Sequence, residues 1–500
     1  MALIGTTWSL CAATTLVALA ACAGSVAEPE RGGGTPGLRI VSSGTASDTI
    51  SSVLAQPLSV EVTDTTGRPA AGRFVVFEVV PATQPRPTGF YEPLAIAREG
   101  DALLRSVILD TTDARGRAAV GVRLGSVVGA SAVRINVPEL GFVDTARYTT
   151  LVGALHHLDV APGDSAAYVG RGYVLRAQAA DRVGNVRPSD PITFSVASGP
   201  VTVDASTGAL VATAIGRARV VATSGTKSAT AFVSVVPRAW VAAQQHFLGN
   251  GGPIGIFLLE LDGSGRTPLA DPIANFYASE QGFGWSPDGR DLAIARGDSV
   301  DLVTPGAPER RLIRTNIPVL LGARFSGDGQ WIYFAQENAG LYRVRRDGTG
   351  LQAIGSGSGR YGQDYRPSPS PDGGAVAYAS DRAPCGFDEC IRVLDLATGM
   401  ERSYGGRGYL VRGAVAAWSP TDDLIAYAAP TEVGVIRSDG SAQRVLDTDV
   451  RLVGWLEWSP DGKWLIVSPG MGPVMLIDIQ TGARLPIPTL GNYGATAWRP

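Results

Sequence analysis

Trp285-Ser286-Pro287-Asp288-Gly289 is the stretch that decides the fold, because versions of it occur five more times in the second half of the sequence. The other copies are Phe325-Ser326-Gly327-Asp328-Gly329, Pro369-Ser370-Pro371-Asp372-Gly373, Trp418-Ser419-Pro420-Thr421-Asp422, Trp458-Ser459-Pro460-Asp461-Gly462 and the shorter Trp498-Arg499-Pro500. Their starts lie 40, 44, 49, 40 and 40 residues apart. A period of roughly 40–50 residues is typical of one four-stranded propeller blade.

Each complete copy has the composition of a tight turn between two strands. Proline presets φ, an aspartate side chain can accept a backbone N–H, and glycine takes a positive φ without strain. An alternating apolar run follows each turn, as in 291–295, 330–335 and 463–467, and a second run ends in another polar turn. Alternation with a period of two predicts antiparallel strands.

The two ends of the repeat region complement each other. The last copy, within 495–500, has no strand pattern after it, whereas 239–245 and 254–263 have strand patterns with no copy before them. Joined, the two ends make one blade, which predicts six blades in a ring closed by the first and last strands. Closure removes the open sheet edges that invite aggregation.

The six phased copies resemble the WSPDG repeat of TolB-type six-bladed β-propellers over residues 238–500. This resemblance implies a binding role, because TolB-type propellers bind protein partners in the periplasm. It does not extend to the particular partners of TolB, which carries a different N-terminal domain.

The composition is that of an ordinary globular protein. The 500 residues are 45% hydrophobic and 18% charged, with a formal net charge of −3. Nothing here is basic enough to favour nucleic acid, so we expect no nucleic-acid partner. The 63 glycines and 33 prolines indicate many turns and an all-β fold.

Residues 1–21 predict a signal peptide. No charged side chain occurs from Met1 to Ala27, and the apolar run ends in Leu19-Ala20-Ala21-Cys22. This resembles a bacterial lipobox, which implies that Cys22 is acylated and anchors the protein to a membrane. An uncleaved membrane anchor and a secreted form without lipid are the alternatives.

The residues after Cys22 predict where the anchored protein is delivered. Ala23 differs from the aspartate that resembles an inner-membrane retention signal, so we expect an outer-membrane lipoprotein facing the periplasm or the cell surface. Residues 22–37 are rich in glycine and proline and predict a flexible tether.

Two cysteines remain outside the signal region, Cys385 and Cys390. A metal site needs more ligands nearby, and a redox pair normally has two residues between its cysteines. We therefore predict a disulfide between Cys385 and Cys390 in a loop between two blade strands, with no metal and no cofactor.

Residues 38–153 and 154–237 each predict a β-sandwich. Strand-like runs such as Leu58–Val62, Arg73–Val80 and Ala118–Leu124 are separated by short turns. The turn that begins at Thr112-Asp113 resembles invasin-type bacterial immunoglobulin-like domains, and 203–236 resembles the closing half of a group 2 domain. The resemblance implies spacers, and the insertion at 81–101 has no assigned role.

We find no catalytic constellation in the sequence. A nucleophilic triad needs a histidine beside serine or cysteine, yet His156 and His157 lie between the two sandwiches and His246 lies in an outer strand. No nucleophile elbow and no phosphate loop with its lysine occurs. We therefore expect a protein that is not an enzyme.

The positions just before each copy are candidates for the lining of the central channel. One residue before the copies, small side chains are expected to make room for large neighbours, and Arg324 and Glu457 are expected to face the channel or each other. This series reads Gly284, Arg324, Ser368, Ala417, Glu457 and Ala497. Three residues before the copies, the series reads Gly282, Gly322, Arg366, Val415, Trp455 and Ala495.

Arg366 and Trp455, with Tyr365 and Tyr493 nearby, are the candidate binding residues. Arginine and aromatic residues are enriched at binding hot spots. Packing between blades is the alternative role for each of them.

The sequence as a whole predicts a monomeric cell-envelope lipoprotein. Its propeller head binds or scaffolds an envelope protein or glycan and is presented on immunoglobulin-like spacers. One alternative is a surface adhesin that uses the immunoglobulin-like modules for contact. The other is a propeller hydrolase or lyase with a site at the channel mouth.

Overall fold

The structure, a computed structural model, is all-β. It describes residues 35–80, 91–245, 255–271, 282–314, 320–336, 339–355, 364–382, 390–404, 415–428, 432–449, 453–469, 473–491 and 493–500. The predictions for the signal peptide 1–21, Cys22, the tether up to 34, residues 81–90 of the insertion, His246 and Cys385 lie outside the described residues. Within those residues, the one helix is a 3-10 turn at Pro488–Leu490, and no helix could cross a bilayer.

The chain forms two compact units. One runs through Gly153 and includes Val183–Asn185, and the other contains Ala154–Arg182 and Val186–Pro500. Within the first unit, the Asn185 side-chain amide donates to the Ser126 carbonyl oxygen at 2.8 Å.

The first unit consists of two sheets with strand orders β1-β3-β7-β5 and β2-β9-β8-β4-β6. Its strands are β1 (Gly37–Ser42), β2 (Thr45–Thr49), β3 (Leu58–Thr63), β4 (Phe74–Val80), β5 (Ala95–Ala97), β6 (Val107–Thr111), β7 (Arg117–Arg123), β8 (Gly129–Val137) and β9 (Phe142–Leu151). The pairing of β2 with β9 is parallel, and the others are antiparallel. The strands expected near Leu58, Arg73 and Ala118 are confirmed.

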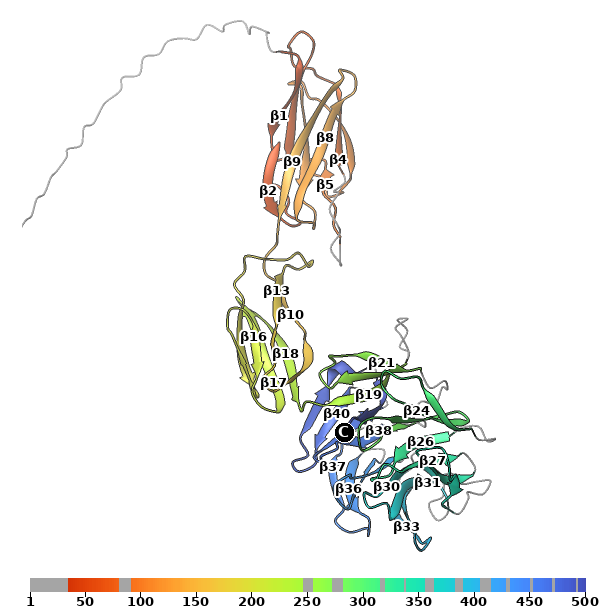
Figure 1. Cartoon of the computed structure of the whole chain (residues 1–500). Helices are drawn as coiled ribbons and strands as arrows, with labels where there is room; N and C mark the ends of the chain where they lie inside the picture. The colour runs from red at the N-terminus through yellow and green to blue at the C-terminus, as the bar shows by residue number, and fades with distance from the viewer. Residues whose placement is uncertain are drawn as a thin grey trace, which may run out of the picture. The chain divides into compact units, whose positions relative to one another are not determined.

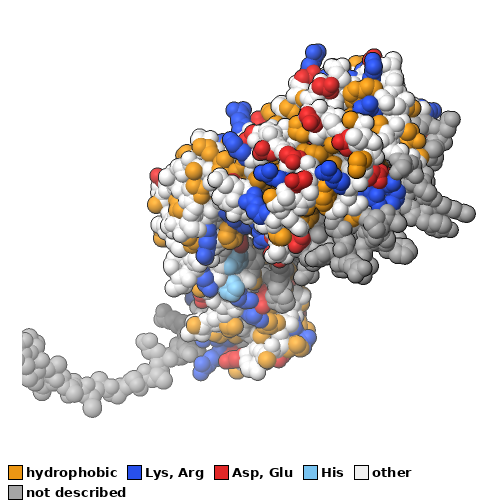
Figure 2. Space-filling model, turned by 90° about the horizontal axis from the view of Figure 1, so that it is seen from below, with side chains coloured by type: hydrophobic (Ala, Val, Ile, Leu, Met, Phe, Trp, Pro, Cys, Tyr) orange, Lys and Arg blue, Asp and Glu red, His pale blue; other side chains and the backbone are white. Residues whose placement is uncertain are grey.

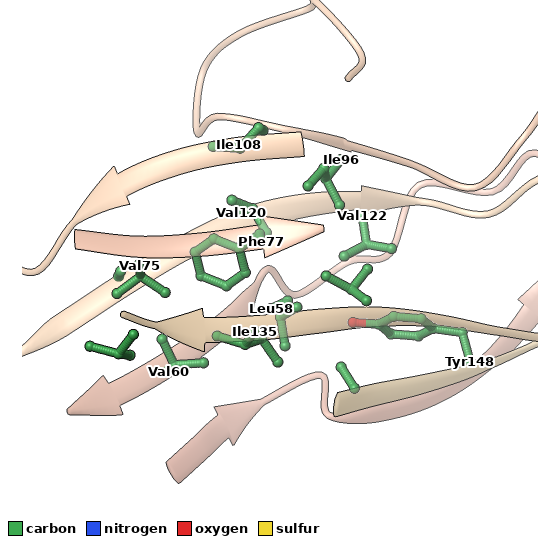
Figure 3. Close-up of a cluster of buried hydrophobic side chains, with 14 of the residues drawn as sticks. Leu58, Val60, Val75, Phe77, Ile96, Ile108, Val120, Val122, Ile135 and Tyr148 are labelled. Carbon is green, nitrogen blue, oxygen red and sulfur yellow. The ribbon is translucent and has the colours of Figure 1, made fainter. Parts of the chain in front are cut away.

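The core of this unit follows from the alternation of its strands. Leu58, Val60 and Val62 of β3 are fully buried, and the residues between them are partly exposed. Side chains from both sheets meet in one apolar cluster, in which Phe77 and Tyr148 are the largest labelled members (Figure 3). Alternation therefore places one face of each sheet inside.

The second unit begins with three small sheets, with orders β10-β13, β11-β18-β17-β14 and β12-β16-β15. The strands are β10 (His157–Ala161), β11 (Asp164–Tyr168), β12 (Gly172–Val174), β13 (Arg176–Ala180), β14 (Thr193–Ser198), β15 (Val201–Val203), β16 (Ala209–Ala212), β17 (Gly216–Ser224) and β18 (Lys227–Val236). They enclose their own core around Leu175, Phe194, Leu210 and Val233.

These small sheets pack directly on the repeat region that follows them in the same unit. Tyr168 and Val236 share an apolar cluster with Leu261 and Leu490. Beside it, the Arg171 guanidinium pairs with Asp262, whose side chain is only 4% exposed. The small sheets and the repeat region are therefore joined by side-chain packing as well as by the covalent connection at 237–239.

Residues 240–498 form a β-propeller. Its described residues contain six four-stranded sheets, which we call blades 1–6 in the order of their innermost strands β22, β26, β30, β34, β38 and β42. The strands of blades 1–3 are β22 (Phe283–Trp285), β23 (Leu292–Arg296), β24 (Ser299–Val303), β25 (Arg310–Arg314), β26 (Leu320–Phe325), β27 (Trp331–Gln336), β28 (Gly340–Arg345), β29 (Gln352–Ala353), β30 (Asp364–Pro369), β31 (Ala375–Ser380), β32 (Cys390–Asp395) and β33 (Glu401–Tyr404). Those of blades 4–6 are β34 (Val415–Trp418), β35 (Leu424–Ala428), β36 (Val433–Arg437), β37 (Arg444–Asp447), β38 (Val453–Trp458), β39 (Trp464–Pro469), β40 (Val474–Asp478), β41 (Arg484–Ile487), β42 (Tyr493–Trp498), β19 (Trp240–Gln245), β20 (Gly255–Glu260) and β21 (Thr267–Ala270).

Blade 6 is built from both ends of the repeat region. Its strand order is β21-β20-β19-β42, and β42 pairs antiparallel with β19, with Val241 opposite Trp498 and Ala243 opposite Thr496. In Figure 1 the green β19 lies beside the blue end of the chain. The innermost strands contact one another in the cycle β22, β26, β30, β34, β38, β42 and back to β22.

The repeated stretch forms the turn from the innermost strand to the second strand of a blade. In blade 3 the buried Ser370 hydroxyl donates to Asp372 at 2.6 Å and accepts the Ala375 N–H at 2.9 Å. The hydrogen bond from Ser370 lowers the pKa of Asp372. Gly373 has φ 72°, where a side chain would be strained. The turn chemistry expected from the sequence is confirmed.

Replacing the turn serine of blade 3 should destabilise the protein more than replacing the turn serine of blade 4. Ser370→Ala leaves the partly buried Ala375 N–H without its partner and should lower the free energy of unfolding by about 1–3 kcal/mol. Ser419 is the matched control, because Thr421 replaces the aspartate there and the contacts of the Ser419 hydroxyl are 3.3–3.4 Å long.

We therefore expect Ser419→Ala to cost less than half as much in urea unfolding. Equal losses for the two variants would show that the serine–aspartate bond does not stabilise the turn.

Candidate functional site

The channel through the propeller is filled at two successive layers of side chains. The layers are the two series defined from the sequence, three residues and one residue before each repeated turn. Each layer combines two large side chains with smaller residues (glycine, alanine, serine or valine) on the other blades. The large residues come from blades 2, 3 and 5.

Trp455 of blade 5 fills the first layer. Its side chain is 2% exposed, stacks on Phe283 of blade 1 with 6.3 Å between ring centroids, and donates its indole N–H to the Thr496 carbonyl of blade 6. A Cβ atom on Gly282 would collide with this indole. The small residue on blade 1 is therefore required by the large one on blade 5.

Arg366 of blade 3 also lies near Trp455. Its guanidinium carbon is 6.0 Å from the ring centroid, and its side chain is buried. Arg366 has φ 49°, in a region that favours glycine, at an irregularity of register between Tyr365 and Ser368. The corresponding residue of blade 2 is Gly322, with φ 63°. Non-glycine residues in this conformation cluster at functional sites.

Arg324 and Glu457 fill the second layer and form an ion pair. Blades 2 and 5 are three steps apart in a cycle of six, so the pair spans the channel. The Arg324 guanidinium also donates to the carbonyl oxygens of Phe283 and Ala323 and lies 4.5 Å from the Trp455 ring centroid. The expectation that Arg324 and Glu457 face each other is confirmed, and Gly284 makes the room expected for Arg324.

The space left between these side chains is very small. Gly322, Arg324, Arg366, Trp455 and their neighbours line a cavity of ≈ 10 Å³, which is about the volume needed for one water molecule. Small-molecule sites are cavities of about 300–1,000 Å³. The described part of the channel therefore has no room for a substrate at this level.

The structure brings two of the four candidate binding residues together. Arg366 and Trp455 are in contact range inside the channel, in positions that also pack blades against each other. Tyr365 and Tyr493 are partly exposed at the starts of β30 and β42. The Tyr365 hydroxyl lies 3.4 Å from Asp381, whereas Tyr493 packs beside the cluster of Tyr168 and Val236. Their binding roles stay predictions.

The other predicted site residues are only partly described. Cys390 is in a disulfide, and its pairing with Cys385 stays a prediction because Cys385 lies outside the described residues. His157 lies 3.4 Å from Asp159. In the described part of the chain, no hydrogen bond joins a serine to a histidine. No group of three potential metal ligands occurs within the described residues.

Sequence reasoning missed a buried charge network in blade 3. Asp364 accepts hydrogen bonds from Ser380 at 2.7 Å and from Arg382 at 2.8 Å, and Arg382 and Arg392 both pair with Glu401 at 3.0 Å. Burial raises the pKa of Asp364. The available signal was Arg392, which interrupts the apolar run of a strand between Ile391 and Val393.

Comparison with known proteins agrees with the propeller assignment. The sequence model of the WD40 domain of anaphase-promoting complex subunit 4 matches residues 416–488. An uncharacterized protein of Agrobacterium fabrum is 28% identical over 197 residues, which cover 35% of this chain and 62% of that protein. The chain thus spans less than two thirds of that relative.

Two solved structures are similar in part. TolB from Acinetobacter baumannii has 14% identity and a TM-score of 0.42, over 62% of this chain and 83% of that one. An oligogalacturonate lyase in complex with manganese has 15% identity and a TM-score of 0.32, over 50% and 72%. The repeats, the six sheets and the family match define a β-propeller protein with WD40-like repeats.

Removing the indole of Trp455 should destabilise the propeller strongly. Trp455→Ala leaves a cavity bounded by blades 1, 2, 3 and 6, and a buried aromatic-to-alanine change costs about 3–5 kcal/mol. Trp455→Phe keeps the stacking on Phe283 and should cost clearly less. Urea unfolding of the second unit measures both. An unchanged midpoint for Trp455→Ala would contradict the packing role.

The carboxyl group of Glu457 should make stability depend on pH near neutrality. Burial raises its pKa from 4.5 to about 7, and Arg324 opposes part of this rise. The folded state therefore binds more protons than the unfolded state between pH 4.5 and 7, so the free energy of unfolding falls as the pH rises through this window.

In Glu457→Gln this fall should be absent. Urea midpoints at pH 5, 6, 7 and 8 measure it, with Glu432→Gln, in the same unit, as the control for the substitution itself. The same slope in Glu457→Gln and wild type would show that Glu457 is not the responsible group.

Proposed function

We propose that the protein is a cell-envelope lipoprotein whose propeller binds or scaffolds an envelope protein or glycan without catalysis. The lipid anchor at Cys22 and the outer-membrane location are part of this proposal and are supported by the lipobox-like sequence Leu19–Cys22. The observation that carries this role is the filled channel. Because the described channel has no room for a substrate, a partner would be recognised on the outer surfaces.

The proposed head is a closed, six-bladed ring presented on two immunoglobulin-like spacers. The pairing of β42 with β19 and the cycle of innermost strands support closure. The parallel pairings of β2 with β9 and of β11 with β18 support the immunoglobulin-like assignment, since both sandwiches share this arrangement. The proposed bounds are 38–153 and 154–237 for the spacers and 238–500 for the head.

One end of the propeller is better suited to a partner than the other. The repeated turns occupy one end of the sheets, where they contact each other: Gly329 lies against Pro287 of the preceding turn, and Gly289 against Pro500. The opposite end, which we call the mouth face, carries the starts of the innermost strands, including Tyr365 and Tyr493. The connections between strands at this face differ in length, so the sequence of this face can vary between proteins of this architecture.

The surface itself is of mixed charge. On the side of the molecule seen in Figure 2, basic and acidic side chains are interspersed with hydrophobic ones. A surface of this kind suits a specific partner with its own pattern of charges better than a uniformly charged polymer.

Site-specific photo-crosslinking in native envelopes tests this function. A photo-crosslinker replaces Arg314, exposed at the mouth-face end of β25, or Lys463, which is 74% exposed beside a repeated turn. We expect a discrete crosslinked partner from position 314 and none from 463.

A crosslinked product only from position 463 would contradict binding at the mouth face. A product only from a crosslinker placed in the first sandwich would also contradict it and would favour the adhesin. Protease accessibility on intact cells then separates a periplasmic from a surface location.

A further inference from the structure

Blade 2 departs from the other five blades at one position of its third strand. This position pairs with the middle of the second strand, and in five blades it holds a buried aliphatic residue that packs between blades. These are Leu302, Val393, Val435, Leu476 and Leu258, opposite Ala293, Ala377, Ala426, Ile466 and Ala242. In blade 2 the pair is Arg343 and Tyr333.

Arg343 belongs to a compact group of basic and aromatic side chains. Its guanidinium carbon lies 4.4 Å from the ring centroid of Trp331, and that of Arg345 lies 5.2 Å from the same ring. Arg343 also donates to the Tyr333 hydroxyl at 3.3 Å and to Gln352 at 3.5 Å. The aromatic ring and these neutral acceptors hold two positive charges close together.

The two charges have no carboxylate of their own. Among the described residues, no Asp or Glu oxygen lies within 4.0 Å of Arg343 or Arg345. Asp347 is near enough for its pKa to be lowered partly by the charge of Arg345, but its carboxylate is held first by Thr349, at 2.7 and 2.8 Å. Most other arginines of blades 1–3, such as Arg346 and Arg382, do pair with carboxylates.

The two arginines also have a defined spacing. They are alternate residues of β28, so their side chains leave the same face of the strand, about 6.5–7 Å apart. Alternate side chains of an extended peptide repeat at the same distance. Guanidinium groups bind carboxylates with paired hydrogen bonds, which an extended acidic segment can offer to both arginines at once.

We infer that Arg343, Arg345 and Trp331 form a binding site for an acidic, extended peptide segment of a partner protein. This inference rests on the proposed binding function and specifies the chemistry of a second contact with the partner, because Trp331 and Arg345 pair next to the repeated turn of blade 2, away from the mouth face. The site explains why blade 2 replaces an aliphatic residue by arginine at a packing position, since local departures from a structural pattern concentrate at functional sites.

The full chain, in its soluble form without the signal peptide, tests the inference by titration against a fluorescent peptide with glutamate at alternate positions. The same peptide with glutamine is the uncharged control. Wild type should bind the glutamate peptide, with an affinity that falls as salt rises. Arg343→Leu restores the side chain type of the other blades and should lower the affinity at least about tenfold.

The melting temperature of Arg343→Leu should be equal to or above that of wild type, because leucine occupies this position in three other blades. Arg437→Leu is the matched control. Arg437 corresponds to Arg345 in blade 4, precedes the same kind of Asp-Gly turn, and stands beside Val435. It should leave peptide binding unchanged.

Equal binding by wild type and Arg343→Leu, or binding of a polyuronate but not of the glutamate peptide, would overturn the inference. Photo-crosslinking from position 314 in the Arg343→Leu background separates it from the proposed function. Partner capture that persists without any peptide binding rejects this site alone, whereas absence of capture in wild type rejects the binding function.

Discussion

Antiparallel pairing between β42 and β19 is the interaction on which the rest of the propeller depends. It joins residues 493–498 to 240–245, so that blade 6 exists only when both ends of the repeat region are in place. It also gives blades 1 and 5 a neighbour on each side, as the contacts of β42 with β22 and β38 show. Without blade 6, these faces would expose apolar residues such as Ile294 of blade 1 and Ile466 of blade 5, which are buried against it.

The propeller imposes a second constraint at its centre, where side chains from its innermost strands meet. Large residues are tolerated only where other blades contribute glycine, as Gly282 does for Trp455 and Gly284 for Arg324. The resulting contacts tie opposite blades together and leave a cavity of ≈ 10 Å³. Under the proposed binding function, recognition by a propeller filled in this way falls to its faces and rims. The backbone at this level is left-handed in two blades, and blade 3 places Arg366 there where blade 2 has Gly322.

Much of this architecture could be predicted from the sequence, because the repeated turn has a local cause. Serine, aspartate and glycine make the same hydrogen bonds in the turns around Ser286, Ser326, Ser370 and Ser459, so six copies were enough to place the strands. The pairing of Arg324 with Glu457 could also be predicted, since both interrupt a series of small residues.

Features that depend on register between distant blades could not be predicted in the same way. The burial of Trp455 requires knowing that it crosses toward Gly282, and the network around Asp364 joins residues from four strands of one blade. Likewise, nothing local shows that Tyr168 packs with Leu261 and Leu490. The exception is Arg343, whose departure is visible as soon as the strands of the six blades are aligned.

The pairing of the two ends is tested most directly by joining them covalently. Ala243 and Thr496 face each other across β19 and β42, so a variant with cysteine at both positions should form an intramolecular disulfide under mild oxidation. Mass spectrometry of the intact protein should find this bond in the monomer, and the melting temperature should rise relative to the reduced form. Free thiols at both positions in the folded protein, or disulfides only between molecules, would contradict the closed ring.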